Sequence, residues 1–330
     1  MRSWGVSVPE PPPAAYHVRM VDGPAKTPRT GRGAGPEERA KGYAALLVVQ
    51  LAFGLFAIFG KWAFVDFTPQ AIVGWRIVFG SAALGGAVLW SQGRRALPTA
   101  RDLVLLALLS LAGVAVNMVL FLEGLRRSTA VNSGLIMPMI PVFTFGLAVL
   151  VRHERFSWTR GIGILVALTA ALGLALGRGA EFSESTRTGN LMMVANAFAY
   201  SLYLVFSRPL VAKYGPLAVT AWVFVLSLWT VPLFAGDVAW IPDHAAPRSW
   251  VSLAYILVFP TLVAYLLNAY ALARVAASTT AVFIFLQSLI TVSSAILMLG
   301  EAMTSQTLIC GALVFAGTAL VLFGPARSRA

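Results

Sequence analysis

Residues 69–90 read PQAIVGWRIVFGSAALGGAVLW, a run of mostly apolar residues that contains a single charge, Arg76. A helix of about 20 such residues spans the hydrocarbon core of a bilayer, which is roughly 30 Å thick. Because that core holds no water to bond a free amide, an unbroken apolar run of this length is expected to be helical. Residues 69–90 therefore predict a transmembrane helix.

Runs of the same kind recur along the 330-residue chain, of which 58% is hydrophobic and 12% charged. Soluble domains carry roughly twice this share of charged residues. The runs are continuous rather than alternating, so they do not predict a membrane β-barrel. The sequence predicts an all-α integral membrane protein. Its ten transmembrane helices are expected at roughly 43–64, 70–90, 103–122, 129–151, 158–177, 190–211, 217–234, 250–272, 278–299 and 305–323.

The first 41 residues differ from the rest in composition. They hold the run Glu10-Pro11-Pro12-Pro13, scattered Gly, Lys and Arg, and no apolar stretch. Segments of this kind cannot bury enough apolar surface to fold, so residues 1–41 are expected to be a disordered basic tail. The tail does not resemble a signal peptide, because no apolar segment follows its charges.

The chain contains an internal repeat. A shift of 147 residues, which takes Trp75 to Trp222, aligns residues 42–177 with residues 189–324 without a gap. The alignment rests on residues that are rare in or beside membrane spans, including the pairs Pro69/Pro216, Trp75/Trp222, Arg127/Arg274 and Glu154/Glu301, with Lys61 opposite Arg208. Each half holds five predicted spans, an odd number, so the two repeats are expected to have inverted topology. Inverted repeats occur in many secondary transporters, which bind substrate near the midplane between the repeats.

The distribution of Lys and Arg predicts the orientation in the cytoplasmic membrane. With the N-terminus in the cytoplasm, eighteen of the 25 basic residues fall on cytoplasmic segments and six on the outer side, while Arg76 lies within a span. Cytoplasmic loops of membrane proteins carry an excess of such residues. Both termini are therefore expected in the cytoplasm. The net charge of +12 fits this topology, and no nucleic-acid partner is predicted.

Other kinds of chemistry find little support in the sequence. The single cysteine, Cys310, lies in an apolar run, and the three histidines, His17, His153 and His244, fall outside the spans. A structural zinc site needs about four ligands, so no metal or cofactor is predicted. No Walker motif is visible, and we expect that the chain does not hydrolyse ATP itself. The small-residue spacing of Gly173–Gly177 favours helix packing or a homodimer contact.

Arg76 lies well inside a predicted span, about 9 Å from the start of its helix at 1.5 Å per residue. An arginine there costs about 2.5–3.5 kcal/mol on insertion scales, so it is expected to face a cavity or a partner. It can bind a substrate carboxylate or a coupled acid, or it can snorkel to the interface or form a structural ion pair. Its repeat partner is Val223, which favours a role in substrate binding over one in the scaffold.

Polar and aromatic side chains in other spans are further candidates. On the helix at 190–211 they recur with the spacing of one helix face, and the helices at 250–272 and 278–299 carry similar residues. Such side chains form hydrogen bonds across helices or line a cavity. A cavity lined by aromatic rings and amide groups would suit an amphiphilic or aromatic small molecule. The predicted substrate-binding residues are Trp75, Arg76, Asn117, Glu123, Asn132, Asn196, Tyr200, Tyr203, Trp222, Tyr265, Asn268 and Gln287.

Two further predictions concern helix ends and kinks. Glu123, at the outer end of its helix, is interpreted as a protonatable group or the counter-ion of Arg76, or as a residue at the lipid headgroups. Pro138 and Pro141 interrupt the helix at 129–151, which predicts a hinge or a static kink. The residues predicted to act as gates or structural supports are Lys61, Pro138, Pro141, Glu154, Arg208 and Glu301.

These residues give the chain a resemblance to the drug/metabolite transporter superfamily, specifically to its EamA-type members with ten helices. It covers about residues 42–324 and rests on Phe53-Gly54 with Lys61, Pro69 with Trp75-Arg76, Gly124-Leu125-Arg126-Arg127, Pro141 with Glu154 and Gly163, and Leu299-Gly300-Glu301 with Gly311. The chain departs from the family pattern at His153, Gln287 and Ser288. The resemblance implies a transporter of small organic molecules, often amino acids or related metabolites.

The function expected from the sequence is a secondary active transporter that moves a small organic metabolite across the cytoplasmic membrane by alternating access, with export as the expected direction. Its expected partners are the substrate, protons as coupling ion and the lipid bilayer. A receptor or scaffold and an intramembrane enzyme are the alternatives. An enzyme would need catalytic groups inside the bilayer, whereas the acidic residues of this chain lie at the ends of spans or outside them.

Overall fold

The computed structural model describes residues 35–154, 156–176, 183–272, 274 and 277–324, and within these ranges every regular element is a helix. Most of the predicted disordered tail lies outside the described residues, but the first helix, α1, begins at Pro36, earlier than the expected start at residue 43. Pro36 occupies its first position, with Glu37 and Glu38 in the first turn. A fixed φ and negative charge both favour a helix start.

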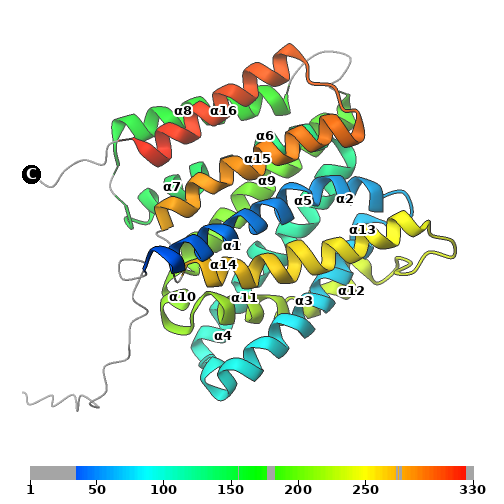
Figure 1. The fold of residues 1–330 in the computed structure, drawn as a ribbon, viewed down its shortest axis with the longest axis vertical. Helices are drawn as coiled ribbons and strands as arrows, with labels where there is room; N and C mark the ends of the chain where they lie inside the picture. Colours follow the sequence, from blue (N-terminus) through cyan, green and yellow to red (C-terminus); the bar gives the residue numbers. More distant parts are fainter. Residues whose placement is uncertain (1–34, 155, 177–182, 273, 275–276, 325–330) are drawn as a thin grey trace, which may run out of the picture.

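The helices run back and forth, roughly side by side, along the bundle (Figure 1). Nine of those described are long and apolar enough to cross a bilayer, and in α15 the described apolar part, residues 283–299, is shorter. The fold class predicted from the sequence is therefore confirmed. The elements in chain order are α1 (Pro36–Gly54), α2 (Phe56–Ala63), α3 (Pro69–Gln92), η1 (Gly93–Ala96), α4 (Ala100–Ser110), η2 (Leu111–Ala115), α5 (Val116–Arg127), α6 (Ala130–Ile136), α7 (Met139–Leu150), α8 (Trp158–Ala175), α9 (Glu184–Phe206), α10 (Arg208–Tyr214), α11 (Pro216–Val225), η3 (Leu228–Thr230), α12 (Val231–Ala235), α13 (Pro247–Val258), η4 (Phe259–Val263), α14 (Ala264–Leu272), α15 (Ala277–Leu299) and α16 (Ser305–Phe323).

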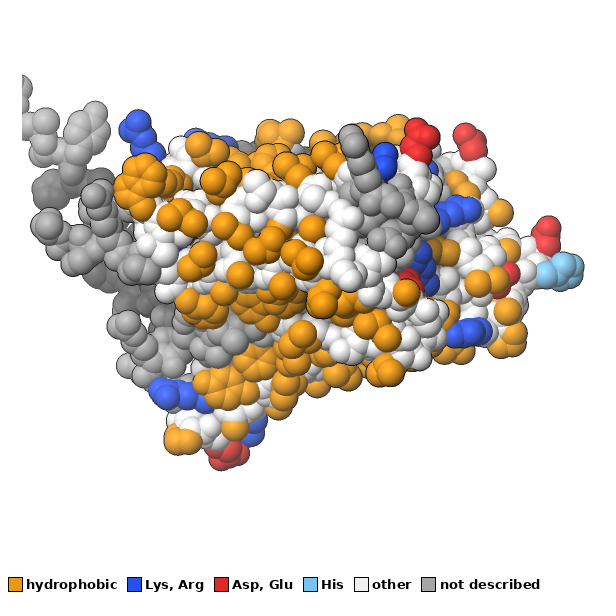
Figure 2. All heavy atoms as spheres, turned by 90° about the horizontal axis from the view of Figure 1, so that it is seen from above, with side chains coloured by type: hydrophobic (Ala, Val, Ile, Leu, Met, Phe, Trp, Pro, Cys, Tyr) orange, Lys and Arg blue, Asp and Glu red, His pale blue; other side chains and the backbone are white. Residues whose placement is uncertain are grey.

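The even number of segments brings Pro36 and Gly324 to the same end of the bundle, here named the near end; the opposite end is the far end (Figure 1). On the face seen in Figure 2, the surface between the two ends is largely apolar, and charged side chains gather towards the ends. Leu150, Leu233 and Leu297 are 77%, 74% and 82% exposed. Exposed apolar side chains in such number are expected where the surface faces lipid rather than water.

The two halves make equivalent contacts at opposite ends of the bundle. At the near end, Arg274 Nε donates to Glu38 Oε2 at 2.8 Å. At the far end, the Ser185 hydroxyl donates to the Arg127 carbonyl oxygen at 3.5 Å. A shift of 147 residues carries one pair onto the other. The interface between the halves is thus duplicated with its direction reversed, as inverted topology requires.

A second equivalent pair joins the segment after the first span of each half to the third span of the other. At the far end, bonds from the Ser249 hydroxyl and the Ala246 N–H lower the pKa of the Asp66 carboxyl below its usual value. At the near end, Lys213 Nζ donates to Asp102 Oδ2 at 2.6 Å, which raises the pKa of Lys213. The repeat carries Asp66 onto Lys213 and Ser249 onto Asp102. The two contacts therefore occupy equivalent positions, but one is a hydrogen bond between Ser and Asp and the other is an ion pair between Lys and Asp.

Glycine allows α5 and α9, which belong to different halves, to pack closely. A Cβ atom on Gly124 would lie 2.7 Å from the Gly189 carbonyl oxygen, and one on Gly189 would lie 2.6 Å from the Gly124 carbonyl oxygen. Small residues permit this approach between membrane helices. Gly173, predicted to serve in packing or in a dimer contact, has its near neighbour within the chain, at Cys310 Sγ of α16.

Arg152, just beyond α7, has a backbone φ of 59°, in the left-handed region that favours glycine. Its replacement by Gly is expected to raise the thermal unfolding midpoint of the detergent-solubilised protein, by the equivalent of about 1 kcal/mol of relieved strain. His153→Gly is the matched control: His153 has no positive φ, so this change relieves no strain. A midpoint for Arg152→Gly at or below that of the wild type would contradict the prediction.

Candidate functional site

The third span of each half contains a short π-helical segment in its middle, η2 in the first half and η4 in the second. In η4, Pro260 lacks the N–H that the Ile256 carbonyl would otherwise accept, and the Thr261 hydroxyl donates to that carbonyl at 2.8 Å. Proline is tolerated within a membrane helix where a neighbouring side chain satisfies the freed carbonyl and the helix adjusts locally. This local chemistry fixes the Thr261 side chain.

Thr261 in turn holds the guanidinium of Arg76 on α3. Arg76 Nε donates to the Thr261 hydroxyl oxygen at 3.0 Å, and Arg76 Cζ lies 4.6 Å from the centroid of the Phe56 ring. Arg76 is only 3% exposed. Among the described residues, no ion pair includes Arg76 and no hydrogen bond uses its terminal nitrogens. Such a cation in a membrane protein usually serves a ligand or an ion pathway.

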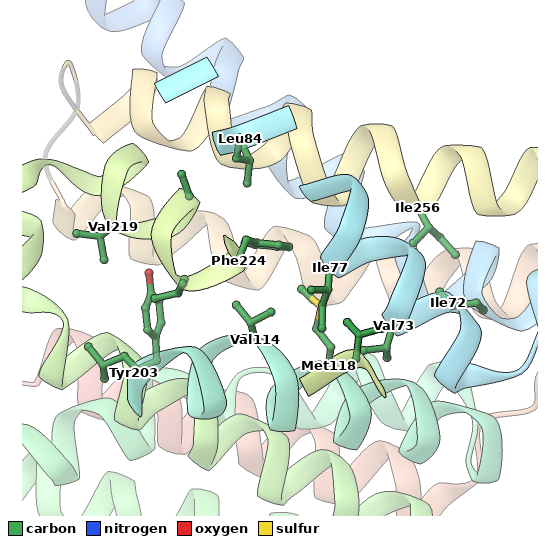
Figure 3. Close-up of a cluster of buried hydrophobic side chains, with 14 of the residues drawn as sticks. Ile72, Val73, Ile77, Leu84, Val114, Met118, Tyr203, Val219, Phe224 and Ile256 are labelled. Atoms are coloured by element: carbon green, nitrogen blue, oxygen red, sulfur yellow. The ribbon is translucent and has the colours of Figure 1, made fainter. Parts of the chain in front are cut away.

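Arg76 and Thr261 break the symmetry of the scaffold. Their repeat partners are Val223 and Val114, which are 1% and 2% exposed and lie in the apolar cluster between the halves; Figure 3 shows the surroundings of Val114. An apolar pair is therefore compatible with this fold, and packing alone does not require the polar one. The sequence analysis missed Thr261, although the change from Val114 to Thr261 at a proline within a span was a visible signal.

Aromatic side chains from both halves belong to the same apolar cluster as Phe56, the ring that the Arg76 guanidinium contacts. Phe224 packs edge-to-face against Tyr265 with ring centroids 5.6 Å apart, and Tyr200 and Tyr203 have centroids 5.7 Å apart. Tyr265 also packs edge-to-face against Phe53, with ring centroids 6.2 Å apart. Three of the predicted site residues, Tyr200, Tyr203 and Tyr265, thus share one apolar cluster, and Arg76 contacts that cluster through Phe56.

Asn117 on α5 and Asn196 on α9 bond to each other's backbone. Asn196 Nδ2 donates to the Asn117 carbonyl oxygen at 2.7 Å, and Asn117 Nδ2 donates to the Asn196 carbonyl oxygen at 3.5 Å. The two predicted site residues therefore join the halves where α5 crosses α9, the same helix pair that Gly124 and Gly189 allow to pack closely. This geometry favours their interpretation as interhelical bonds over that as cavity lining.

Trp75 and Trp222, which are repeat partners, each bond to a loop of the opposite half. The Trp75 indole N–H donates to the Trp240 carbonyl at 3.0 Å, and the Trp222 indole N–H donates to the Ala96 carbonyl at 2.6 Å. Both indole N–H groups are used in this conformation. The two tryptophans therefore anchor loops at opposite ends of the bundle.

Glu123 lies at the far end and is 6% exposed. Its carboxylate accepts hydrogen bonds from Gln70 Nε2 and from Arg127 Nη1. The partner of Glu123 in this conformation is therefore Arg127, and Arg76 has no part in the pair. These residues border an open depression of about 460 Å³, whose lining residues are Gln70, Glu123, Arg126, Arg127 and Ser185.

The three remaining amides of the predicted site lie in different places. Asn132 Nδ2 donates to the Ser128 hydroxyl at 3.2 Å, and that hydroxyl donates to Asn190 Oδ1. Asn132 therefore belongs to a buried polar cluster at the far end. Asn268 and Gln287 are partly buried, and within the described part of the chain no hydrogen bond to either side-chain amide is found.

Two predicted gate residues, Lys61 and Glu301, meet the start of α6 at the far end. The two carboxylate oxygens of Glu301 accept the N–H groups of Ala130 and Val131 at 2.9 and 2.8 Å, and Lys61 Nζ donates to the Ser128 carbonyl. Glu301 belongs to the second half and α6 to the first, so this contact closes the far end across the halves.

At the near end the repeat partners of these residues form a looser contact. Glu154 Oε1 lies 3.7 Å from Arg208 Nη2, and Glu154 Oε2 lies 3.5 Å from Arg160 Nη1. We expect Glu301→Ala to lower the thermal unfolding midpoint by the equivalent of about 1 kcal/mol, as for loss of a helix cap. Glu154→Ala is the repeat-matched comparison and is expected to cost less, because partly exposed ion pairs contribute about 0–1 kcal/mol. An equal or larger loss for Glu154→Ala would contradict this ranking.

The kink at Pro138 and Pro141 is held by the second half. The Thr318 hydroxyl of α16 donates to the Pro138 carbonyl at 3.1 Å, and the Ser201 hydroxyl of α9 donates to the Ile140 carbonyl at 2.9 Å. Carbonyls at a kink in a membrane helix need such partners. The break between α6 and α7 is thus stabilised from two sides in this conformation.

Two inverted five-helix repeats that enclose a buried cation define the protein as a membrane transporter of the inverted-repeat class. The sequence profile of the EamA-like transporter family matches residues 40–176 and 187–323. The chain belongs to this family, and the resemblance seen in the sequence is confirmed.

Two similar curated proteins are named as a transporter and an exporter. The chain is 27% identical over 255 residues to the uncharacterized transporter YdfC of Bacillus subtilis, covering 76% of this chain and 81% of that protein. It is 28% identical over 231 residues to a probable terminal-alkyne amino-acid exporter of Streptantibioticus cattleyicolor, covering 68% of this chain and 74% of that protein. A solved crystal structure matches with a TM-score of 0.59 and 17% identity, covering 86% of this chain and 96% of the other, which supports the fold.

Proposed function

We propose that the protein is a secondary active transporter that exports a small organic metabolite, an amino acid or a related compound, across the cytoplasmic membrane. The observation that carries this proposal is Arg76, a buried cation that contacts the opposite half through Thr261 and has no acidic partner among the described residues. Sites of this kind between inverted repeats serve transport by alternating exposure to the two sides. Transport, and no catalysis, is the proposed activity.

The proposed orientation places the near end, with both termini, in the cytoplasm, because Lys and Arg are in excess on that side. Cross-half contacts are present at both ends, with Glu301 on α6 at the far end and Arg274 on Glu38 at the near end. We propose that these contacts open in turn. The similarity to a protein named as an amino-acid exporter supports both the substrate group and the direction.

Protons are the proposed coupling ion, and Glu123 is the group proposed to carry them. Its carboxylate is buried at the edge of the far-end depression. It forms an ion pair with Arg127, whose side chain is partly exposed. Protonation of Glu123 would release Arg127, which belongs to the interface between the halves through its carbonyl bond to Ser185. A homodimer has no part in this proposal.

The experiment that tests the function begins with the metabolites in the medium of overexpressing and deletion strains. Compounds enriched by overexpression are then loaded into proteoliposomes that hold the purified protein and no ATP. We expect efflux down the substrate gradient and acceleration by the same compound outside. A strict ATP requirement, or no flux of any enriched compound, would end the secondary-transport proposal.

A further inference from the structure

We propose that Arg76 binds the carboxylate of an organic monocarboxylate, and that Thr261 is the positioning residue that orients the guanidinium for it. Amino acids and simple aromatic or aliphatic acids both belong to this substrate class. The inference rests on the proposed function, because it names the substrate class of the same site.

The first step concerns the direction of the Arg76–Thr261 bond. The Thr261 hydroxyl donates its hydrogen to the Ile256 carbonyl at 2.8 Å, so its oxygen can only accept towards Arg76. Arg76 Nε donates to it at 3.0 Å. A guanidinium has five N–H groups, one on Nε and four on the terminal nitrogens. Fixing Nε therefore fixes the plane of the group and leaves the terminal edge for a ligand.

The second step concerns the face of the guanidinium. Arg76 Cζ lies 4.6 Å from the centroid of Phe56, and Phe56 in turn stacks on Phe121 with centroids 5.0 Å apart. The ring covers one face of the guanidinium and Thr261 occupies its Nε–H, so the N–H groups that remain for a ligand lie on the terminal edge. That edge offers two parallel N–H groups, which match the two oxygens of a carboxylate.

The third step separates a substrate carboxylate from a coupled acid of the protein. Glu123, the buried acid on the neighbouring α5, is already bonded to Gln70 and Arg127, and no ion pair of Arg76 occurs among the described residues. The single charge of Arg76 neutralises one carboxylate. The second carboxylate of a dicarboxylic acid would be buried without a partner, so a monocarboxylate is favoured. The ammonium of an amino acid can lie against aromatic faces such as Tyr265. An amide has no charge to offer to Arg76.

The fourth step separates the two bonds of the Thr261 hydroxyl, since one satisfies the Ile256 carbonyl that Pro260 frees and the other holds Arg76. The first half forms the equivalent π-helical segment, η2, with Gly113 in place of Pro260 and Val114 in place of Thr261. A π-helical segment thus forms without a threonine where no proline frees a carbonyl, and the second half adds the bond that the Thr261 hydroxyl oxygen accepts from Arg76 Nε. It places Thr261 in the role of orienting the cation.

The test measures ligand binding by thermal unfolding of the purified full-length protein in detergent. The probes are phenylacetate and L-leucine as acids, with phenylacetamide and L-leucinamide as their carboxyl-blocked counterparts. The wild type is expected to be stabilised by the acids and not by the amides, and Arg76→Gln is expected to lose the effect. Thr261→Val is expected to weaken the apparent affinity for the acids at least ten-fold, whereas Thr261→Ser retains it.

The matched control is Thr318→Val, which removes another buried hydroxyl bonded to a carbonyl, that of Pro138, in a different part of the bundle. It is expected to leave the affinity for the acids within two-fold of the wild type. In flux measurements, Thr261→Val is expected to raise the KM for an acid while the maximal rate stays within two-fold. A purely structural role would lower the maximal rate and the amount of folded protein together.

Three results would each overturn the inference: equal stabilisation by acids and amides, stabilisation by neither acid, or wild-type affinity in Thr261→Val. The fate of the proposed function is separable. Transport of an uncharged or cationic metabolite that survives Arg76→Gln would overturn the carboxylate site and leave transport standing. Acid-selective binding without flux of any compound in proteoliposomes would overturn the proposed transport and leave the carboxylate site standing.

Discussion

Arg76→Gln is expected to accumulate in the membrane to the wild-type level and to lose transport by about 100-fold, in line with the loss of one partner of a buried charge pair. Glutamine fits in the space of the arginine and removes a charge that has no acidic partner among the described residues. Its removal therefore relieves a cost of burial in the free protein and leaves the substrate without its counter-charge. The measurement is efflux from proteoliposomes, normalised to the amount of inserted protein.

Two further variants make this result specific. Arg76→Lys keeps the charge but loses the planar pair of N–H groups, so an intermediate loss of about 10-fold is expected. Arg101→Gln removes an exposed arginine at the near end and is expected to transport normally. Wild-type flux in Arg76→Gln would remove this residue from the site. A fall in its abundance would instead show that the arginine supports the fold.

The fold was predictable because its determinants are local or repeated. The apolar length of each span requires a helix in the membrane, and matched Trp, Pro, Arg and Glu residues reveal the duplication. The start of α1 at Pro36 was not predicted, since it depends on the proline and the acidic first turn and not on hydropathy. The contacts at the two ends, such as that of Asp66 with Ser249, depend on tertiary packing between residues far apart in the sequence, which no local sequence pattern reveals.

The candidate site was only partly predictable. Depth in the bilayer singled out Arg76, and the structure supplies the contacts that depth cannot give, with Thr261 and Phe56. The same argument gave no way to choose between an interhelical bond and cavity lining for Asn196, because both roles place an amide at the same depth. Its reciprocal bonds with Asn117 decide the matter only once the two helices are seen to cross.

Gly124→Leu is expected to have the second large effect, on the amount of folded protein. The Cβ of any larger residue at position 124 would lie 2.7 Å from the Gly189 carbonyl oxygen and 2.8 Å from Met193 Cγ. A backbone carbonyl cannot rotate away as a side chain can, so α5 and α9 must separate. Overpacking of this kind costs roughly 1–3 kcal/mol or more, and separation also breaks the bonds between Asn117 and Asn196.

The measurement is the monodisperse peak in size-exclusion chromatography after detergent extraction, and a loss of about five-fold or more is expected, in line with a cost above 1 kcal/mol. Gly86→Leu is the matched control in another span: apart from its chain neighbours and its own helix backbone, no atom lies within 4 Å of the position its Cβ would take, and leucine is the better helix former. It is expected to match the wild type. If Gly124→Leu were as abundant as Gly86→Leu, α5 and α9 could not approach as closely as they do here. Because this crossing joins the first half to the second, the arrangement of the two inverted repeats around Arg76 would then be wrong as well.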